Sequence, residues 1–218
     1  MRAGRFKKIP QPTIARLSTY LQCLRDLEKE GVRTVSSREI AQRTGINAAQ
    51  FRKDLSYFGE FGKPGVGYQV SHLKQRIMEQ MGLDEEHPVL LVGAGSLGSA
   101  LAGYPGFPAQ GFRIEAIFDN NPMKVGQRVA GITIEPLESL RRVNSTVRAK
   151  MAIIAVPREG AQDVADRLVR NGIKCILNFA PIKVNVPDDV VVRNVDLTQE
   201  LEVLSYYMRA MEAGQGKQ

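Results

Sequence analysis

The stretch that decides the fold of this chain is Val89-Leu90-Leu91-Val92-Gly93-Ala94-Gly95-Ser96-Leu97-Gly98. Its apolar start predicts a buried parallel strand, and Ser99-Ala100-Leu101-Ala102 after it predicts a helix. Between strand and helix, Gly93, Gly95 and Gly98 form the pattern G-x-G-x-x-G. In that position the first glycine makes a tight turn, the second lets the backbone approach a pyrophosphate, and the third lets helix and strand pack closely. The stretch therefore predicts a dinucleotide-binding fold with the pyrophosphate at the helix N-terminus.

The next predicted strand, from Phe112 to Phe118, ends at Asp119, which lies 21 residues after Gly98. An acidic residue at about this distance bonds the adenosine ribose in dinucleotide-binding folds. A carboxylate there accepts hydrogen bonds from both ribose hydroxyls and repels a 2′-phosphate, so we expect NAD(H) rather than NADP(H). Taken without the rest of the chain, this half of the sequence also fits a CoA-binding module.

Strand and helix patterns continue to alternate after this point. We expect a strand over 151–156, an amphipathic helix over 159–171 and a strand over 175–178. This alternation predicts an α/β domain with a doubly wound parallel sheet of the Rossmann type, in which the carboxyl ends of the strands border the ligand crevice. The residues expected at the nicotinamide end of the crevice are Ala155, Val156, Pro157, Asn178, Phe179, Ala180 and Pro181.

The first 80 residues follow a different pattern, which is typical of a winged-helix DNA-binding domain. Pro12 lies near a helix start, and Ser36 with Glu39 forms a capping box that predicts a second helix ending at Gly45. Asn47 can cap a third helix. Two short helices joined at a glycine turn are typical of a helix-turn-helix. The apolar residues that predict the buried stripe of the first helix are Ile14, Leu17, Leu21, Leu24 and Leu27.

The third helix is the expected recognition helix. Its outward side chains are able to bond base edges or phosphates in a major groove; they are Gln50, Arg52, Lys53, Ser56 and Tyr57. The glycine-rich segment 59–68 predicts a hairpin wing with Lys63 at its tip. Residues 1–80 hold 15 Lys and Arg against 7 Asp and Glu, whereas residues 81–218 hold 15 against 16. This division of charge favours double-stranded DNA as the partner of the N-terminal domain.

Composition and length set the domain organisation and exclude several classes of protein. The 218 residues are 43% hydrophobic and 24% charged, with a formal net charge of +7, which is typical of a globular protein. The sequence has no apolar run that would span a membrane, no signal peptide and no metal-ligand spacing. We therefore expect a soluble, cytoplasmic protein without a metal. We expect a DNA-binding domain over 1–82, an NAD(H)-binding domain over 83–195 and a C-terminal helix with a tail over 196–218.

The chain lacks the usual catalytic residues of a dehydrogenase. Of its two histidines, His72 lies just after the wing and His87 just before the first strand of the sheet, at the end opposite the crevice. The sequence also leaves no room for a large substrate domain. Cofactor binding without turnover is therefore favoured over an enzyme. Lys183 or Tyr104 could still donate a proton, so the alternative is an NAD-dependent oxidoreductase with an appended DNA-binding domain.

The last predicted helix follows Asp196 and carries an apolar seam two heptads long. The seam consists of Leu197, Leu201, Leu204, Met208 and Met211. Sustained coiled coils need three or more heptads, which favours docking of this helix on its own domain. The pattern by itself leaves pairing with a second chain open.

Motifs in both halves of the chain match one known family. They are Lys8-Ile9-Pro10-Gln11, Val35-Ser36-Ser37, Arg52-Lys53-Asp54-Leu55-Ser56-Tyr57-Phe58-Gly59-Glu60-Phe61-Gly62, Gly65-Val66-Gly67-Tyr68, Val92-Gly93-Ala94-Gly95-Ser96-Leu97-Gly98, Tyr104-Pro105-Gly106-Phe107 and Asn178-Phe179-Ala180-Pro181. With these motifs the sequence closely resembles the Rex family of redox-sensing transcriptional repressors of bacteria. The resemblance implies a homodimer that binds an inverted-repeat operator when NADH is low and leaves it when NADH rises.

The resemblance also implies roles for individual parts of the chain. The glycine loop would hold the pyrophosphate, Asp119 the ribose, and Tyr104 would lie close to the nicotinamide. The C-terminal helix would be exchanged between the two subunits. The expected cofactor site comprises Gly93, Ala94, Gly95, Ser96, Leu97, Gly98, Tyr104, Asp119, Asn120, Ala155, Val156, Pro157, Asn178, Phe179, Ala180 and Pro181.

A switch between two states is implied as well. Asp196 resembles a family residue that changes partners, pairing either with Arg16 or with Tyr104 across the dimer. A physical reason for redox discrimination stands beside the resemblance, because NAD⁺ carries a positive charge on its nicotinamide and NADH does not. Burial of an unpaired charge among apolar groups such as Val156 is unfavourable, so an apolar pocket should prefer NADH.

Overall fold

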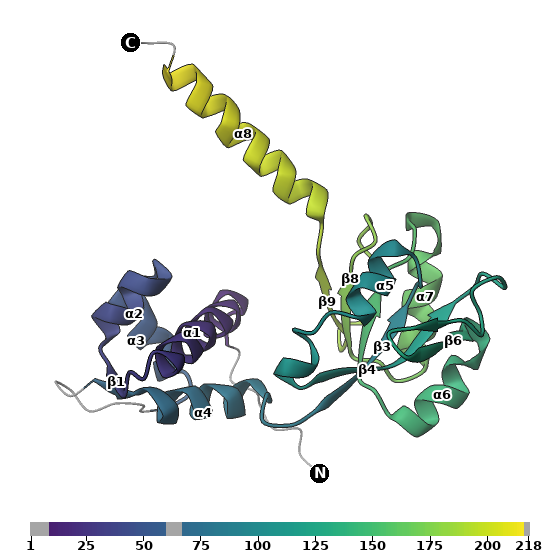
Figure 1. The fold of residues 1–218 in the computed structure, drawn as a ribbon, viewed down its shortest axis with the longest axis horizontal. Helices are drawn as coiled ribbons and strands as arrows, with labels where there is room; N and C mark the ends of the chain where they lie inside the picture. The colour runs from purple at the N-terminus through teal and green to yellow at the C-terminus, as the bar shows by residue number, and fades with distance from the viewer. Residues whose placement is uncertain (1–8, 60–66, 216–218) are drawn as a thin grey trace. The chain divides into compact units, whose positions relative to one another are not determined.

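The computed structural model describes residues 9–59 and 67–215 and divides into two compact units, the second of which begins at Glu86 (Figure 1). The N-terminal unit contains helices α1 (Gln11–Lys29), α2 (Ser37–Thr44), α3 (Ala48–Ser56) and α4 (Val70–Met81), with the short strands β1 (Thr34–Val35) and β2 (Tyr68–Gln69). Helices α1, α3 and α4 meet in one apolar core, whose members include Leu17, Leu21, Leu24, Phe51, Leu55, Leu73 and Ile77.

Helix α1 buries most of its predicted stripe. The four leucines at most 2% exposed are Leu17, Leu21, Leu24 and Leu27. Ile14, however, is 46% exposed, so its predicted place in the core is wrong. Thr13 is buried in its place, because its hydroxyl donates a hydrogen bond of 3.0 Å to the buried carboxylate of Asp54.

The two helices of the predicted helix-turn-helix are confirmed. The hydroxyl of Ser36 accepts a hydrogen bond from the Glu39 amide (3.1 Å), and the Glu39 carboxylate accepts one from the Ser36 amide (2.7 Å), which completes the capping box. Gly45 ends α2 with a φ of +71°, a left-handed conformation that glycine adopts without strain. Oδ1 of Asn47 accepts a hydrogen bond of 2.8 Å from the Gln50 amide and caps α3.

Most of the predicted hairpin wing, residues 60–66, lies outside the described residues. Strand β2 pairs antiparallel with β1, the strand that precedes α2, so that Tyr68 lies opposite Val35. Lys63, the predicted wing tip, lies outside the described residues, as do residues 1–8. Sequence reasoning missed α4, although Val70, Leu73 and Ile77 are spaced by three and four and are all buried.

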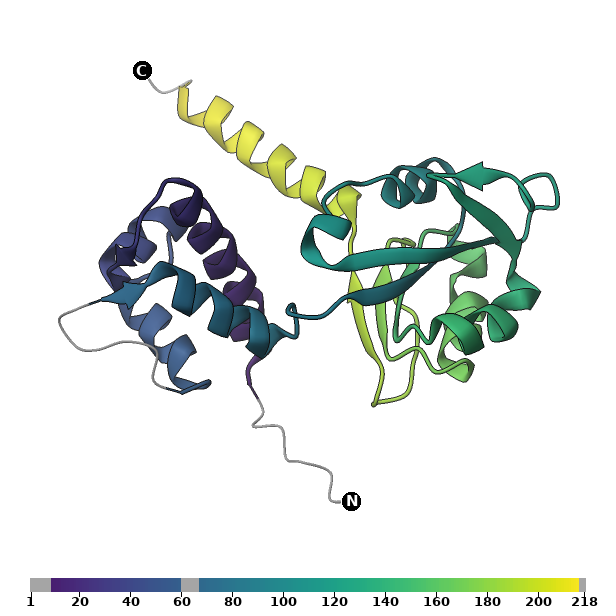
Figure 2. The ribbon, with the colours of Figure 1, turned by 60° about the horizontal axis from the view of Figure 1, so that its bottom comes forward.

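The C-terminal unit is built on a seven-stranded sheet with the order β5-β6-β4-β3-β7-β8-β9 (Figure 2). Its strands are β3 (His87–Val92), β4 (Phe112–Asp119), β5 (Arg128–Val129), β6 (Ile132–Pro136), β7 (Met151–Ile154), β8 (Cys175–Asn178) and β9 (Val191–Asn194). Every neighbouring pair is parallel except β5 with β6. The predicted α/β fold with a parallel sheet is confirmed, and its strand order reverses at β3, between β4 and β7.

Helices cover the two faces of this sheet unequally. Helices α6 (Leu140–Val147) and α7 (Arg158–Arg170) pack on one face, where Leu140 and Leu168 join a buried cluster with Phe118. On the other face lies α5 (Ser96–Ala102), with short 3₁₀ turns at Pro108–Gln110 and Leu137–Ser139 elsewhere in the unit. The cluster on the α5 face keeps several apolar side chains partly exposed, among them Phe112 and Ile114.

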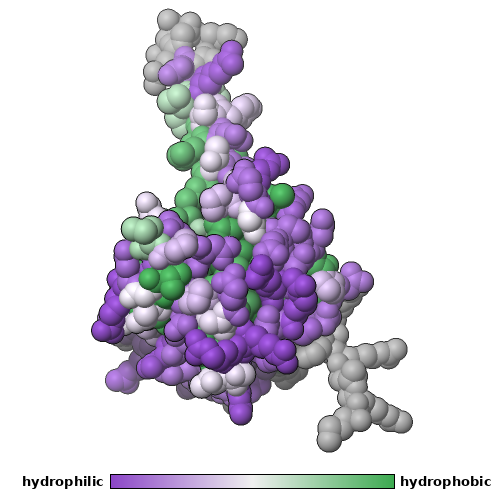
Figure 3. All heavy atoms as spheres, turned by 90° about the vertical axis from the view of Figure 1, so that its right-hand side faces the viewer, coloured by the Kyte–Doolittle hydropathy of each residue, from purple (hydrophilic) through white to green (hydrophobic). Residues whose placement is uncertain are grey.

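Helix α8 (Leu197–Gln215) presents its apolar seam to solvent. All side chains from Leu197 to Glu212 are exposed, and the five seam residues are between 57% and 67% exposed. Figure 3 shows apolar side chains, in green, among polar ones on the surface of this helix. Docking of the seam on its own domain is therefore not seen in the described part of the chain. None of the helices described in residues 9–59 and 67–215 is long and apolar enough to cross a membrane.

Candidate functional site

The three glycines of the motif after β3 meet different structural requirements. Gly93 has a φ of +104°, and a Cβ atom there would lie 2.3 Å from the carbonyl oxygen of Ala155. A Cβ atom on Gly98 would lie 1.8 Å from the carbonyl oxygen of Gly93. Gly95 has an ordinary φ of −78°, and a Cβ atom there would meet nothing within 4 Å. The packing of the chain thus explains Gly93 and Gly98, whereas the open space beside Gly95 fits the approach of a pyrophosphate.

A cleft of about 340 Å³ opens beside this loop, at the carboxyl ends of β3, β4 and β7, and its size is that of a small-ligand site. Strand β7 ends at Ile154, so the predicted segment from Ala155 to Pro157 forms a loop at the cleft. Ala94 is buried, and Ser96 and Leu97 lie exposed in the first turn of α5. The residues that line the cleft are Val92, Gly93, Gly95, Asp119, Asn120, Lys124, Leu137, Ala155, Val156, Pro157, Gly160 and Val164.

Asp119 is held in place at the edge of the cleft by three donors. Its Oδ2 accepts a hydrogen bond from the Ala94 amide (2.8 Å) and lies 3.2 Å from Nζ of Lys124. Its Oδ1 accepts a hydrogen bond from the Asn121 amide (2.8 Å). Burial raises the pKa of Asp119, but these hydrogen bonds and the Lys124 charge outweigh burial and lower the pKa below its ordinary value. The carboxylate is therefore ionised at neutral pH and is a preoriented acceptor for hydroxyl groups.

Lys124 is a cleft residue that sequence reasoning missed. Its ammonium group pairs with Asp119, and its side chain is 34% exposed. The sequence signal for this role was its position, five residues after Asp119 and beyond the turn that follows β4. The pair gives this end of the cleft both a negative and a positive group.

Asn178 supports the loop after β8 and does not line the cleft. Its side chain is fully buried, and its Nδ2 donates to the carbonyl oxygen of Ile182 (2.7 Å) and to Oδ1 of Asn194 (2.9 Å). Its Oδ1 accepts a hydrogen bond of 3.1 Å from the Ala180 amide. The Phe179 amide bonds the carbonyl oxygen at the end of β7 (2.9 Å), so the segment from Phe179 to Pro181 runs beside that strand end.

Tyr104 lies in a second pocket rather than in this cleft. The residue is 54% exposed, and its ring contacts Phe107 edge to face, with ring centroids 5.2 Å apart. A Cβ atom on Gly106 would lie 2.3 Å from the Tyr104 ring, so the glycine lets the ring fold over the turn. The pocket also includes Phe112 and Ile132. Within a single chain, Tyr104 is thus not brought to the residues that line the cleft.

The outer face of α3 carries most of the predicted DNA-contacting side chains. Arg52, Lys53 and Ser56 are exposed, and Tyr57 is half-buried just after the helix. Nη1 of Arg52 donates to the hydroxyl of Ser37, the first residue of α2 (2.9 Å). The Ser56 hydroxyl donates to the carbonyl oxygen of Lys53 (2.7 Å). Two cations therefore project from one face of a short helix, which is suited to a DNA backbone.

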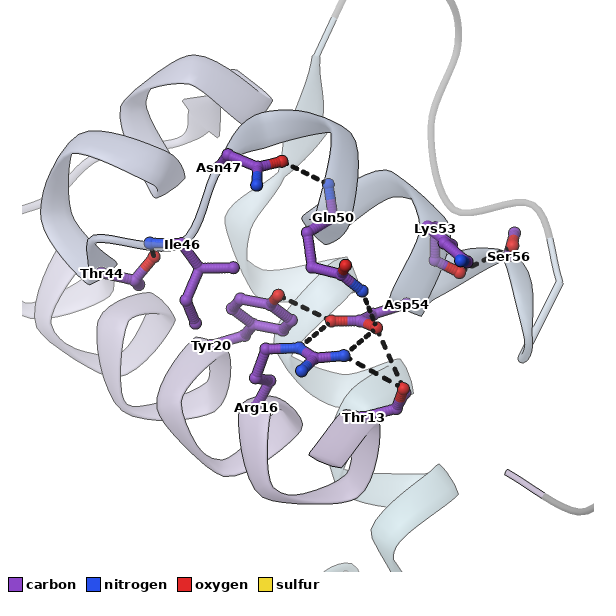
Figure 4. Close-up of polar contacts among 10 residues, drawn as sticks. All are labelled: Thr13, Arg16, Tyr20, Thr44, Ile46, Asn47, Gln50, Lys53, Asp54 and Ser56. Carbon is purple, nitrogen blue, oxygen red and sulfur yellow. Dashed lines mark hydrogen bonds and ion pairs between the residues drawn. The ribbon is translucent and has the colours of Figure 1, made fainter. Parts of the chain in front are cut away.

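The inner face of α3 carries a buried carboxylate that sequence reasoning missed (Figure 4). Asp54 is 0% exposed. Its carboxylate accepts hydrogen bonds from Nε (2.5 Å) and Nη2 (2.7 Å) of Arg16, from the Tyr20 hydroxyl (2.8 Å), from the Thr13 hydroxyl (3.0 Å) and from Nε2 of Gln50 (2.8 Å). The sequence did contain a signal for this buried carboxylate, because the charged residue lies between two core positions of the helix. This cluster ties α3 to α1.

The Asp54 cluster changes the proton affinities of its members. Burial raises the pKa of Asp54, but the hydrogen bonds from its donors, Arg16 first among them, lower it below its ordinary value. The Tyr20 hydroxyl shows the opposite shift, because burial and its hydrogen bond to Asp54 raise its pKa. Arg16 is likewise raised in pKa by its hydrogen bonds to Asp54. At neutral pH the cluster is therefore an ionised carboxylate surrounded by donors.

The predicted switch residues lie on different elements. Arg16 pairs with Asp54 inside the N-terminal unit, and its side chain remains 26% exposed. Asp196 precedes α8, and its Oδ1 accepts hydrogen bonds from the amides of Thr198 (3.0 Å) and Gln199 (3.2 Å). The described residues contain no group of three or more His, Cys, Asp and Glu side chains that could hold a metal ion.

Known proteins similar to this chain share both of its halves. A family model described as "Putative DNA-binding protein N-terminus" matches residues 8–56, and one described as "CoA binding domain" matches residues 84–182. The redox-sensing transcriptional repressor Rex of Desulforamulus reducens is 49% identical over 205 residues, which cover 94% of this chain and 98% of the relative. The Rex protein of Carboxydothermus hydrogenoformans is 50% identical over 202 residues, which cover 93% and 97%.

Solved structures give the same result. The crystal structure of RSP in complex with β-NAD⁺ and operator DNA matches with a TM-score of 0.89 and 38% identity, over 95% of this chain and 96% of that one. The structure of RSP in complex with β-NADH matches with a TM-score of 0.86 and 35% identity, over 97% and 100%. With this identity across nearly the full length of its relatives, the chain belongs to the Rex family of redox-sensing transcriptional repressors.

Proposed function

We propose that this protein represses transcription as a homodimer on an inverted-repeat operator, and that NADH bound in the cleft beside Gly95 releases it from DNA. The main support is that one chain combines a helix-turn-helix with a cleft whose open glycine and fixed carboxylate suit a dinucleotide. RSP, a relative 38% identical, has been crystallised with β-NAD⁺ and operator DNA, and also with β-NADH. A repressor of bacterial genes acts on the chromosome, so we place the protein in the cytoplasm.

On the DNA side, α3 is the proposed recognition helix. Arg52 and Lys53 are exposed cations suited to phosphates, and phosphate contacts set the position of a protein on the duplex. Ser56 and Tyr57 offer hydroxyl groups at the end of the helix, and Gln50 lies in its first turn. Residues in the first turn of a recognition helix are those that reach base edges.

On the cofactor side, the proposed site extends from the glycine loop across the carboxyl ends of the strands. The pyrophosphate would lie at the N-terminus of α5 beside Gly95, and the ribose hydroxyls would donate to Asp119. The nicotinamide would face the loops after β7 and β8, where Val156, Pro157 and Phe179 are apolar. An uncharged dihydronicotinamide is easier to bury there than a cationic nicotinamide, which favours NADH over NAD⁺.

A titration of operator DNA tests this function. We expect NADH to release the protein from a fluorescent operator, obtained by selection from random duplexes, at concentrations where NAD⁺, NADPH and CoA have little effect. Fluorescence anisotropy at fixed salt measures the release. Allosteric coupling of the usual size would weaken operator affinity by about 5- to 150-fold, and DNA would weaken NADH binding by the same factor. Tight operator binding that is indifferent to all four ligands would overturn the proposal.

The exposed seam of α8 supports a second copy of the chain as its partner. The seam is a continuous apolar surface exposed to solvent, and such a surface usually marks a site of contact with another protein. The α5 face of the sheet also keeps apolar side chains partly exposed. We infer that α8 is exchanged between the two subunits of the homodimer. The apolar surfaces left uncovered in one chain would then be covered in the dimer.

Leu204→Glu should convert the dimer into monomers, because it places a charge in the middle of the seam. Light scattering after size-exclusion chromatography measures the molar mass. Ala210→Glu is the matched control, since it introduces the same charge outside the seam of α8 and should leave the mass unchanged. A dimeric Leu204→Glu protein would contradict the exchange of α8.

For the switch, we propose that Asp196 pairs with Arg16 of the other subunit in one state and with Tyr104 in the other. The Arg16 side chain remains partly exposed while it bonds Asp54, so it can also pair with a second acidic side chain. Asp196→Asn keeps a cap for α8 but removes the charge. The variant should bind operator and NADH yet lose most of the coupling between them, measured by the same anisotropy titration. Asp188→Asn, another exposed acid of the C-terminal unit, is the control, and normal release by Asp196→Asn would rule out the switch.

The alternative functions have less support. Relatives at 49% and 50% identity are named as transcriptional repressors, which supports a regulator over an NAD-dependent oxidoreductase. A CoA-binding role is suggested by the family model for residues 84–182, but Asp119 would repel the 3′-phosphate of CoA as it would repel a 2′-phosphate. The CoA arm of the titration separates these two ligands.

A further inference from the structure

The side-chain amide of Gln50 is held in one orientation from inside the domain (Figure 4). Its Nε2 donates a hydrogen bond of 2.8 Å to Oδ1 of Asp54. An ionised carboxylate only accepts hydrogen bonds, so the nitrogen of the amide and not its oxygen must face Asp54. The amide orientation of Gln50 is thereby fixed by chemistry, with its carbonyl Oε1 on the side that Asp54 does not engage.

The support for this amide is itself rigid. Asp54 is fully buried and is bound by three side chains of α1, those of Thr13, Arg16 and Tyr20. The backbone of Gln50 is fixed as well, because its amide N–H donates to the capping side chain of Asn47. Most of the ordering of a long, flexible side chain is therefore complete before DNA arrives.

The free end of the amide lies where a recognition helix reads bases. Gln50 is in the first turn of α3, and no hydrogen bond from residues 9–59 or 67–215 reaches its Oε1. In the major groove the base-edge donors are the N6 amine of adenine and the N4 amine of cytosine, whereas guanine and thymine offer acceptors there. Oε1 itself therefore bonds adenine or cytosine, and not guanine or thymine, on the strand that it faces.

We propose that Gln50 is a specificity-determining residue that reads one adenine or cytosine in each operator half-site through Oε1, and that Asp54 is its positioning residue. The inference rests on the proposed binding of operator DNA by α3. It assigns the reading of this one position to a half-buried side chain, beside the exposed cations Arg52 and Lys53, which are suited to the DNA backbone.

An operator scan with Gln50→Met tests the reading role. Methionine keeps the length of the side chain and removes the amide. Each base pair of the selected half-site is substituted in turn, and the affinity of each duplex is measured by fluorescence anisotropy. For the unmodified protein, guanine or thymine at the position read by Gln50 should lower affinity about tenfold. With Gln50→Met that preference should disappear at this position and persist at the others.

Gln22→Met is the matched control. Gln22 donates to Asp26 four residues along α1, as Gln50 does to Asp54 in α3, but on an exposed surface. The control should keep the complete pattern of preferences. A scan in which Gln50→Met also keeps the complete pattern overturns the inference while the proposed function stands. If the unmodified protein binds no duplex specifically, the proposed function itself fails.

Gln50→Glu tests the positioning role of Asp54 while leaving Asp54 itself in place. The new carboxylate keeps two acceptor oxygens, but repulsion from Asp54 should turn it away from the orientation that Gln50 holds. We expect the same local loss of preference as for Gln50→Met, expressed as a ratio between duplexes so that general repulsion by DNA cancels. Asp54→Asn, assayed where circular dichroism shows it folded, should give the same local loss. Retention of the preference by Gln50→Glu would show that Asp54 does not position the reader.

Discussion

Asp54→Ala should destabilise the N-terminal unit by about 3–5 kcal/mol, because removing one partner of a buried ion pair leaves the remaining groups unsatisfied. The alanine would leave the buried Tyr20 and Thr13 hydroxyls without their acceptor. It would also release the Arg16 guanidinium, which holds α1 against α3. The C-terminal unit has its own core and should be unaffected. Native-state hydrogen exchange of the full chain measures both units at once, since amides in α1 and α3 should lose protection while those in α7 keep it.

A second arginine–carboxylate pair in the same unit is the control. Arg43 donates two hydrogen bonds to Glu30, of 2.7 Å and 2.6 Å, but both side chains are exposed. Glu30→Ala should therefore change protection far less than Asp54→Ala, because water replaces the lost partner. Equal effects of the two substitutions would contradict the importance of burial at Asp54.

The lowered pKa of Asp54 adds a pH dependence with a definite sign. Its carboxylate stabilises the fold fully above the pKa of the unfolded chain, about 3.9, and this contribution is lost as the pH falls through the lower pKa of the folded state. The N-terminal unit should therefore weaken below about pH 4, and Asp54→Asn should remove that part of the dependence.

Gly95→Ala should weaken control by NADH without harming the fold. The open space beside Gly95 and its ordinary φ mean that the protein tolerates a methyl group there. A pyrophosphate in that space would meet the methyl group, and overpacking of about 1–3 kcal/mol would weaken NADH binding by roughly ten- to a hundredfold. Calorimetric titration with NADH measures the affinity, and release from the operator should need correspondingly more NADH.

Substitutions at two other glycines distinguish an effect on NADH binding from an effect on folding. Gly103 lies at the opposite end of α5, where a Cβ atom would come no closer than 3.9 Å to another atom, so Gly103→Ala should leave NADH affinity unchanged. Gly98→Ala would place a methyl group against the carbonyl oxygen of Gly93 and should lower the thermal stability of the C-terminal unit. Normal NADH affinity of Gly95→Ala would show that the dinucleotide does not pass beside this residue.

The features predicted correctly from the sequence depend on short segments. The glycine loop, the caps of α2 and α3 and the alternation of strands and helices are each encoded within a few turns or one strand. Periodicity was sufficient for the leucines of α1 but failed for Ile14. Thr13 is buried instead, because its hydroxyl donates a hydrogen bond to Asp54. Periodicity within α1 could not predict this contact, since Asp54 lies 41 residues further along the chain.

The sequence by itself therefore determined the two kinds of fold, the glycine loop and the helix that carries Arg52 and Lys53. Only the tertiary structure decided that Asp54 is a buried acceptor for α1, that Lys124 pairs with Asp119, that Asn178 supports a loop, and that Tyr104 lies in a different pocket from Gly95. The physical reason is that helices, caps and tight turns follow from neighbours in sequence. The partner of a polar side chain follows from the segment that packing brings beside it, which for Asp54 lies 34 to 41 residues away.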